Sequence, residues 1–228
     1  MRVNLVPKHL REMNPELKIY SCYDEEFRKF GRTVREVGDR RKPYVTLNDT
    51  PIPEEGNIYV ASDPVLEKLA MVKNISRRVF GEIPVQAGYC NGRGYTMNAL
   101  EYHKSPEVNF TTTGCILLLA TPDKVFYNKY IYSSDLTAFY INPNIPVCIN
   151  PGVLHFAPLR TKEEGFRCMV ILPKGTNEPL SKMPNPIRDD EEGILWMKNK
   201  WLICHRDSPQ AEKGAFDGIC GRNIQIRI

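Results

Sequence analysis

The stretch "GCILLLATPDKVFYNKYIYSSDLTAFYINPNIPVCINPGVLHFAPL", residues 114–159, alternates short apolar runs with Gly, Pro, Asn and Asp. The apolar runs are rich in Ile, Leu, Val, Phe and Tyr, and each has about the length of one β-strand. Similar runs occur at 83–89, 95–103 and 166–172. Many short strands separated by turn residues at this spacing predict a β-sandwich or a closed β-barrel.

The first 82 residues have a mixed character. Helical patterns occur at 7–13, 24–37 and 63–80, and a short strand-like run occurs at 57–62. Asp63 and Pro64 suit the start of the last of these helices, and Gly81 suits its end. We therefore predict a mainly β protein with some helix (α+β), in which an extension over 1–82 packs on a β-barrel over 83–228.

The segment 173–193 is rich in Pro, Gly and charged residues. We predict that it leaves the barrel as a long loop, a kind of segment that often crosses over a site. The tail is strand-like again at 194–205, and residues 223–228 are predicted to pair at a sheet edge.

Composition limits the classes of protein to which this chain can belong. Its 228 residues carry a net charge of +4, and the densest basic runs, at 39–42 and 76–78, lack the clustering of a nucleic-acid-binding surface. The start lacks the apolar run of a signal peptide, and no window approaches the ~20 apolar residues of a membrane span. The seven cysteines are odd in number, with no C-x-x-C pair. We expect a cytoplasmic protein with reduced thiols that binds neither nucleic acid nor membranes.

Two segments contain candidate metal ligands. In "NALEYHKSPEVN" (98–109), Glu101 and His103 are two residues apart and would share one face of a strand, and the Ser-Pro turn that follows could return Glu107 to the same point. "NPGVLHFAP" (150–158) adds His155. Two imidazoles and two carboxylates suit Zn, Mn, Fe(II) or Ni better than Ca or Cu(I). The alternative is that both histidines are ordinary hydrogen-bonded core residues.

These two segments resemble the metal-binding motifs of the cupins. A first cupin motif has His-x-His, three or four residues and Glu, and a second has Pro-x-Gly-x-x-His. Here the first reads Glu101-x-His103-x-x-x-Glu107, so glutamate replaces the first histidine. In the second, the proline directly precedes the glycine before His155, and Leu159 stands where asparagine is usual. The resemblance implies a double-stranded β-helix (jelly-roll) barrel, a divalent metal on Glu101, His103, Glu107 and His155, and a homodimer.

A closer resemblance covers most of the chain. The runs "QAGYCNG" (86–92), "MNALEYHKSPEVN" (97–109), "WMKNKWLICH" (196–205) and "EKGAFDGICGRN" (212–223) resemble DUF4867, a bacterial family of uncharacterised cupin-like proteins. This resemblance implies no catalytic residues.

The metal site favours an enzyme that acts on a small sugar or sugar acid. We predict an isomerase or epimerase that moves a proton through an enediolate, with Glu107 as general base; a lyase that uses the same proton abstraction is close behind, and a dioxygenase is third. Alternatives are a non-catalytic metal- or sugar-binding protein and an interaction protein without metal. Residues near the predicted pocket are candidates for substrate binding: Gln86, Tyr89, Asn91, Lys198 and Lys200. For the two lysines, a solvated strand face is the competing interpretation.

Overall fold

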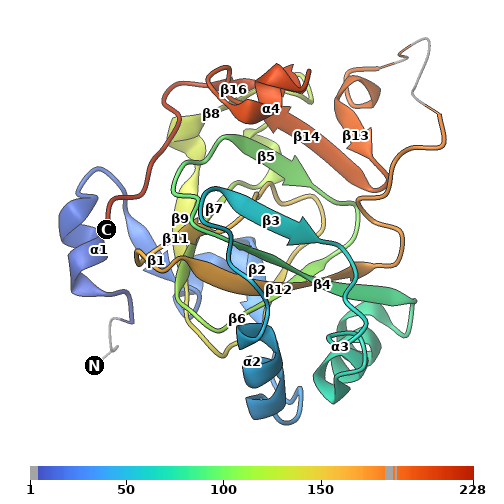
Figure 1. Cartoon of the computed structure of the whole chain (residues 1–228). Coiled ribbons are helices and arrows are strands. Elements are labelled where there is room, and N and C mark those ends of the chain that lie inside the picture. The colour runs from blue at the N-terminus through green and yellow to red at the C-terminus, as the bar shows by residue number, and fades with distance from the viewer. Residues whose placement is uncertain (1–4, 183–186, 188) are drawn as a thin grey trace.

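The computed structural model describes residues 5–182, 187 and 189–228, and two β-sheets form its centre (Figure 1). The six-stranded sheet has the order β2-β10-β6-β12-β4-β3, and the four-stranded sheet has the order β1-β9-β7-β11. In sheet order, the strands of the first are Gly31–Thr33, Val147–Ile149, Glu107–Thr111, Phe166–Pro173, Val85–Gly92 and Asn57–Val60. Those of the second are Ile19–Ser21, Thr137–Ile141, Cys115–Leu119 and Leu159–Arg160.

The strand order is that of a jelly roll. In one sheet β4, β12, β6 and β10 are antiparallel neighbours. Opposite them lies β5 (Ala99–Tyr102), where Glu101 forms an isolated antiparallel bridge with His155. The segment 153–160, which contains His155, pairs with β7, and β7 in turn pairs with β9. Consecutive strands thus cross between the two sheets as they do in two linked Greek keys. The predicted cupin-like jelly roll is confirmed.

The space between the sheets is filled by side chains from both of them. Phe139 on β9 is fully buried there, and its ring centroid lies 5.8, 5.2 and 5.0 Å from those of Tyr20, Phe27 and Phe30. Other members of this inner cluster include Leu117, Leu119, Val147, Ile149, Phe166, Val170 and Leu172. The inner cluster fixes the separation of the sheets and therefore the positions of the strands that carry the site.

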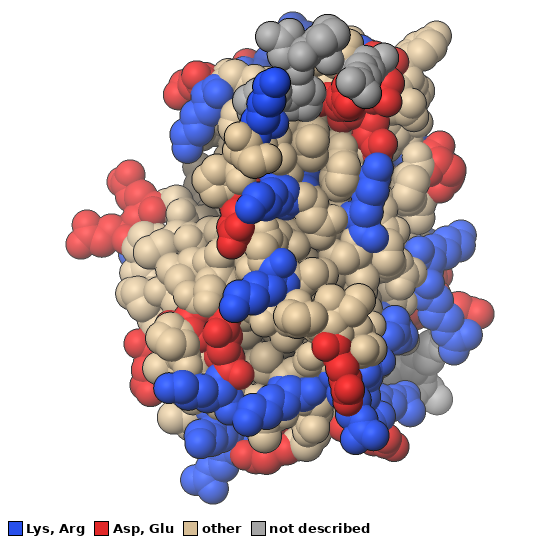
Figure 2. All heavy atoms as spheres, turned by 90° about the vertical axis from the view of Figure 1, so that its right-hand side faces the viewer, with Lys and Arg blue, Asp and Glu red and all other residues tan. Residues whose placement is uncertain are grey.

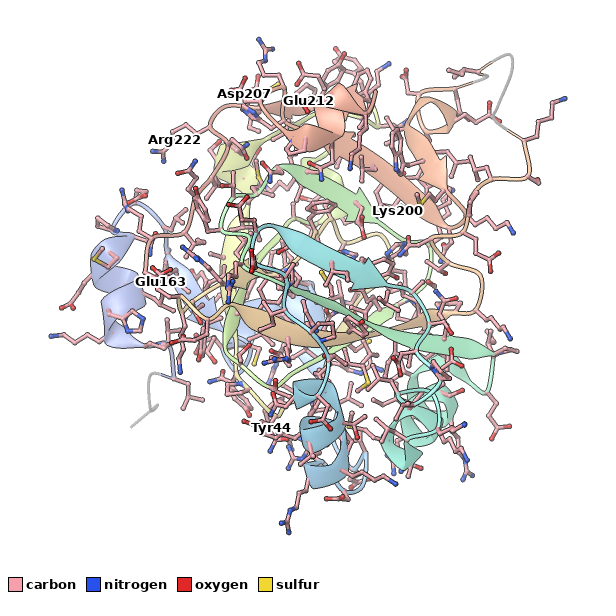
Figure 3. All side chains as sticks on the ribbon, viewed as in Figure 1. Tyr44, Glu163, Lys200, Asp207, Glu212 and Arg222 are labelled. Atoms are coloured by element: carbon pink, nitrogen blue, oxygen red, sulfur yellow. The ribbon has the colours of Figure 1, made fainter. Side chains whose placement is uncertain are left out.

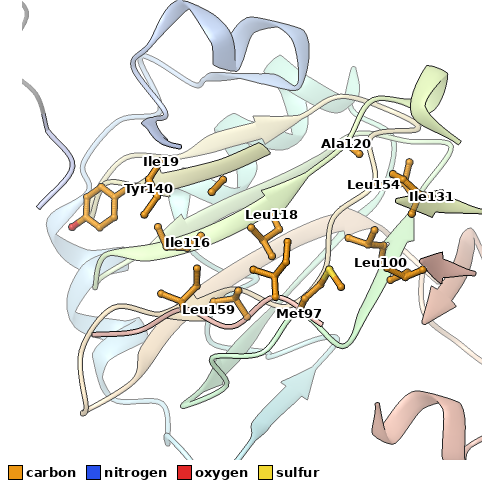
Figure 4. Packing of buried hydrophobic residues seen from close by; sticks show 14 of the residues in the cluster. Ile19, Met97, Leu100, Ile116, Leu118, Ala120, Ile131, Tyr140, Leu154 and Leu159 are labelled. Carbon is orange, nitrogen blue, oxygen red and sulfur yellow. The ribbon is translucent and has the colours of Figure 1, made fainter. Parts of the chain in front are cut away.

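The outer faces of both sheets are covered as well. Ile116 and Leu118 of β7 belong to a buried cluster with Met97, Leu100, Leu154 and Leu159 (Figure 4). Leu10 of α1 (Lys8–Met13), Ile224 and Ile226 belong to the same cluster. The outer face of the other sheet packs against α2 (Arg41–Asn48) and α3 (Ala70–Phe80), which lie below it in Figure 1. Burial on both faces explains why β7 reads as the continuous apolar run CILLL instead of alternating with polar residues.

A third group of strands lies beside β5. β13 (Leu195–Met197) and β14 (Lys200–Cys204) form a hairpin, and β14 pairs antiparallel with β5 and parallel with β15 (Phe216–Asp217). β16 (Ile219–Cys220) pairs with β8 (Ile131–Tyr132), and α4 (Pro209–Glu212) lies between β14 and β15 in the chain. As predicted, the tail pairs at an edge: the Met97 and Ile226 amides donate to the Ile224 and Tyr95 carbonyls.

The helical prediction for 24–37 is wrong. Only Glu25–Lys29 is helical, as a 3₁₀ turn, and β2 follows. A Cβ atom at Gly31 would lie 2.2 Å from the Cys148 carbonyl oxygen, so glycine allows β2 to approach β10 there. α2 was not predicted. Its first turn is held by hydrogen bonds from the Arg41 and Lys42 amides to the Asp39 carboxylate.

The helix predicted over 63–80 begins later than expected. Asp63 accepts hydrogen bonds from the Val65 and Leu66 amides, but regular helix starts at Ala70. Gly81 ends it in the left-handed conformation, as predicted, with a φ of 60°. The division at residue 82 stays a prediction. β1, β2 and β3, all within 1–82, add strands to the two sheets.

Other predictions concern the loop, the surface and the cysteines. The loop was predicted over 173–193, but its first residue, Pro173, is the last residue of β12. Residues 183–186 and 188 of this loop lie outside the described residues. Within the described residues, no helix has the length and apolar character of a membrane-spanning segment. Figure 2 shows Lys and Arg side chains interspersed with Asp and Glu on the face in view. All seven cysteines are free.

Truncating Phe139 tests the inner cluster. We expect Phe139→Ala to lower the free energy of unfolding by about 3–5 kcal/mol, because the cavity it leaves is enclosed by both sheets. Urea denaturation followed by tryptophan fluorescence measures this change. Tyr127→Ala is the control, since Tyr127 is 77% exposed and its loss should cost less than about 0.5 kcal/mol. Equal effects of the two substitutions would contradict this account of the core.

Candidate metal centre

The four candidate ligands are brought together by backbone pairing. Glu101 lies on β5, and its amide and carbonyl exchange hydrogen bonds of 2.6 and 2.9 Å with the backbone of His155. Two residues further on, the His103 carbonyl accepts a hydrogen bond from the Gly152 amide. Side chains that are paired in this way lie on the same face. The bridge therefore sets Glu101, His103 and His155 side by side, and Glu107 begins β6 opposite them.

Backbone carbonyls orient both imidazoles. Nδ1 of His103 lies 2.6 Å from the Asn199 carbonyl oxygen, and Nδ1 of His155 lies 2.9 Å from that of Val153. Because a carbonyl only accepts, each Nδ1 carries a proton and donates it. In a neutral imidazole this leaves the Nε2 lone pair free to bind a metal, an arrangement common among ligating histidines.

Both Nε2 atoms face the same carboxylate oxygen. Oε2 of Glu107 lies 3.4 Å from Nε2 of His103 and 3.4 Å from Nε2 of His155. The other oxygen of Glu107, Oε1, accepts a hydrogen bond of 2.7 Å from the Asn109 amide. Asn109 thus holds one oxygen of Glu107 and leaves the other facing the two imidazoles.

These distances fit a shared ion. Ligand atoms about 2.1 Å from one cation and about 90–110° apart lie roughly 3.0–3.4 Å from each other. Nε2 of His103 is buried and has no hydrogen-bond partner, which a bound cation would provide. The ligand atoms of Glu101, His103 and His155 also lie within 4.8 Å of one another. The described residues therefore form a His/Glu cluster that could hold a metal ion.

The electrostatics of the cluster favour a positive charge at its centre. Burial alone would lower the pKa of His155, but the Glu107 carboxylate raises this pKa to about 9. Burial alone would raise the pKa of Glu107, but His155 and His103 hold it well below its usual range. A proton or a metal ion can supply the charge between these side chains.

Glu101 is shared between the cluster and Lys200. Its Oε1 lies 3.7 Å from Nε2 of His103, and its Oε2 forms an ion pair with the Lys200 ammonium. Lys200 is the first residue of β14, and β14 pairs directly with β5 (Figure 3). Of the two carboxylates, Glu101 is therefore held less closely by the imidazoles than Glu107.

A cavity of about 400 Å³ opens onto the cluster. Glu101, Glu107, His155 and Lys200 line it, while His103 lies deeper and is 1% exposed. Side chains that can bind hydroxyls also line it: Asn57, Tyr59, Thr96, Asn98, Asn109, Asn177 and Gln210. Phe156, Ala157, Pro158 and Val170 provide apolar surface. This size and mixture suit a small polar ligand.

Among the residues predicted to bind substrate, Lys200 lines this cavity and the other four do not. The Gln86 amide is bonded to the backbone of Gly175 and Thr176, and Lys198 pairs with Glu178. Tyr89 packs in the cluster under α2 and α3. The Asn91 amide is bonded to the backbone of Pro51 and to the Thr50 hydroxyl. Proximity along the chain was misleading for Tyr89 and Asn91, because alternate residues of β4 face opposite sides and Cys90 faces the cavity instead.

Two residues of the site were missed from the sequence. Asn109 lies two residues after Glu107 on the same strand, and its shared face was the available signal. Asn199 lies at the β13–β14 turn with a φ of 54°, and its side chain also bonds the Lys104 amide and the hydroxyls of Ser105 and Thr176. Asn is frequent in such tight turns, but the contact of its carbonyl with His103 could be identified only from the folded structure.

Comparisons with known proteins give one family and several distant structures. The family model described as "Domain of unknown function (DUF4867)" matches residues 19–224. No curated protein matches the chain. Oxalate decarboxylase from Bacillus subtilis at pH 4.6 aligns with a TM-score of 0.35 and 12% identity, over 56% of this chain and 28% of that chain. A structure of this enzyme from a study of its Mn(II) centres gives 0.31 and 10%, over 43% and 24%.

Procruciferin, an 11S globulin from Brassica napus, has a TM-score of 0.32 and 10% identity, over 55% of this chain and 24% of that chain. The chain thus spans about a quarter of the length of the proteins in these structures.

Removal of either histidine should abolish metal binding. We expect His103→Ala and His155→Ala each to weaken the affinity for Zn²⁺ or Mn²⁺ by at least about 100-fold, since each removes a ligand and leaves a buried carboxylate unbalanced. Metal content after dialysis, determined by inductively coupled plasma mass spectrometry, measures the loss. The control is His9→Ala on the exposed face of α1, which should keep its metal. Retention of metal in both site variants would exclude this centre.

Asn109 tests whether Glu107 must be held in one orientation. We expect Asn109→Ala to weaken metal binding about 10- to 100-fold, because Oε1 of Glu107 loses its partner and the carboxylate can turn. Competition with a coloured chelator gives the dissociation constant. Asn177→Ala is the matched control, because Asn177 lines the same cavity but its amide donates to the Tyr59 hydroxyl instead of to Glu107. An unchanged constant in the Asn109 variant would show that Glu107 is oriented by the imidazoles alone.

Proposed function

We propose that this chain, which belongs to the DUF4867 family, is a metal-dependent enzyme that isomerises or epimerises a small sugar or sugar acid. The observation that carries the proposal is the convergence of Nε2 of His103, Nε2 of His155 and Oε2 of Glu107, two of which belong to residues that line the cavity. Such an isomerisation or epimerisation needs a cation, a proton acceptor and hydroxyl-binding groups within one small volume.

His103, His155 and Glu107 would hold the metal, with Glu101 within reach as a fourth ligand. The two-nitrogen, one- or two-oxygen donor set accommodates Zn, Mn, Fe(II) or Ni. When bound, a divalent ion supplies a Lewis acid that polarises a carbonyl oxygen and makes the neighbouring C–H bond more acidic.

We assign proton transfer to Glu101 instead of Glu107, which the sequence had favoured. Glu107 is enclosed by two imidazoles and the Asn109 amide, so its oxygens are already engaged. Glu101 lines the cavity, and its ion pair with Lys200 requires it to be ionised, which makes it a proton acceptor. For isomerisation, Glu101 would take a proton from the hydroxyl-bearing carbon next to the carbonyl and return it to the former carbonyl carbon of the resulting enediolate, while the hydroxyl proton passes to the former carbonyl oxygen.

The polar side chains of the cavity wall support a polyol substrate. Besides Asn109, which holds Glu107, four side-chain amides and the Tyr59 hydroxyl line the cavity and offer donors and acceptors for sugar hydroxyls. Phe156 offers an apolar face of the kind on which sugar C–H groups pack. The expected homodimer, the cytoplasmic location and the absence of nucleic-acid partners stay predictions.

Exchange of a substrate proton with solvent tests the proposal. Aldoses, ketoses and uronates incubated with metal-loaded protein in D₂O should gain deuterium at the carbon next to the carbonyl, observed by ¹H NMR. We expect Glu101→Gln to slow this exchange by about 10²- to 10⁴-fold, the usual contribution of a general base. Glu178→Gln is the control, because Glu178 pairs with Lys198 away from the cavity.

Metal content distinguishes the possible results. A Glu101→Gln variant that keeps its metal and loses exchange supports the assignment. If the variant loses its metal as well, Glu101 is a ligand and the base must be sought elsewhere. Sugar binding without exchange by the wild-type protein would favour the alternative, a metal- or sugar-binding protein without catalysis.

A further inference from the structure

The charges that line the cavity are few. Among the described residues of its wall, Glu101 and Glu107 are the acids, and Lys200 is the one Lys or Arg. The Lys200 side chain is 14% exposed, so its ammonium is largely removed from water. A charge in such a place interacts more strongly with a ligand than a surface charge does.

A metal-loaded cavity carries one net positive charge. A divalent cation balances the two carboxylates, and the Lys200 ammonium is then in excess. A neutral sugar would leave this charge uncompensated in a partly buried volume, whereas a monoanion would neutralise it. The balance of charge therefore favours a ligand with a single negative group.

Lys200 also has hydrogen-bonding capacity to spare. Its ammonium has three N–H donors, and the Glu101 carboxylate is the one anionic partner that it has within the described residues. The Phe156 ring, whose centroid is 5.9 Å from the ammonium, borders the same part of the cavity. A ligand oxygen can therefore approach Lys200 from the cavity without displacing Glu101.

From these observations we infer that the substrate is a small sugar acid whose carboxylate binds Lys200. The inference rests on the proposed function and names the substrate class for the same cavity. A carboxylate is favoured over a phosphate because a phosphate carries up to two charges and is generally held by several donors or by arginine. A single ammonium matches a single carboxylate.

Lys198 provides the comparison. It lies two residues before Lys200, but its ammonium pairs with Glu178 at 2.9 Å and its side chain is about half exposed. It lies outside the cavity wall. The same substitution at Lys198 therefore changes the net charge of the protein equally without changing the charge of the cavity.

The test compares ligands in which a carboxylate replaces a hydroxymethyl group. Isothermal titration calorimetry on metal-loaded protein would use three matched pairs: D-glucuronate with D-glucose, D-galacturonate with D-galactose, and D-gluconate with D-sorbitol. D-glucose 6-phosphate is included to separate a carboxylate from a phosphate. Each ligand is titrated into the wild type, Lys200→Met and Lys198→Met. A double variant, Glu101→Gln with Lys200→Met, avoids a buried unpaired carboxylate if the single variant does not fold.

We expect at least one acid to bind the wild type more tightly than its neutral partner. Lys200→Met should weaken binding of that acid about 10- to 100-fold, as expected for loss of a hydrogen bond to a charged group, and the double variant should behave similarly. Lys198→Met should bind every ligand as the wild type does, and Lys200→Met should weaken binding of the acid more than binding of its neutral partner.

The inference is overturned if no acid is preferred to its neutral partner, if the phosphate binds more tightly than every carboxylate, or if Lys200→Met keeps full affinity for the acid. These results would leave the proposed function standing, provided that the protein holds its metal and exchanges a sugar proton. Failure to hold metal, measured on the same samples, would instead remove the proposed function.

Discussion

The site depends on one short backbone pairing, in which Glu101 and His155 exchange two hydrogen bonds between β5 and the segment that precedes β11. This pairing closes the second sheet of the jelly roll next to β7. It also sets the register of three candidate ligands at once, because a shift by one residue would turn each of them to the other face. Fold and metal centre are therefore specified by the same contact.

Further hydrogen bonds orient the side chains that this register brings together. Backbone carbonyls of Asn199 and Val153 fix which nitrogen of each imidazole faces the centre, and the Asn109 amide does the same for the Glu107 oxygens. Lys200 draws one oxygen of Glu101 away from the cluster. The two carboxylates thus have different surroundings, and from this difference we assign one to metal binding and the other to proton transfer.

Much of the architecture was predictable from the sequence because its strands are short, apolar and separated by turn residues. The jelly roll was expected, and strand order confirmed it. Errors arose where local pattern and tertiary context disagreed. Residues 24–37 have a helical pattern, yet Gly31 lies in a strand because it packs against the Cys148 carbonyl. In a strand buried on both faces, such as β7, the apolar pattern alone does not say which side chains face inward.

The ligands could be proposed from spacing, whereas the cavity wall could not. Glu101 and His103 share a face by strand periodicity, and the Gly-x-x-His pattern identified His155. Tyr59, Asn98, Asn177 and Gln210 reach the cavity from separate parts of the chain, and only the folded topology brings them together. Of the five predicted substrate contacts, Lys200 lines the cavity because it faces the same side of its sheet as Glu101 on the paired strand.

The pairing of β5 with β14 has a consequence for how the protein is made. The ribosome must synthesise the chain beyond residue 200 before the Asn199 carbonyl can orient His103. A nascent chain that ends earlier already contains all four ligand side chains but lacks the contacts that aim them. The candidate ligands therefore reach their common arrangement late in biogenesis, and a stalled or truncated product would lack it.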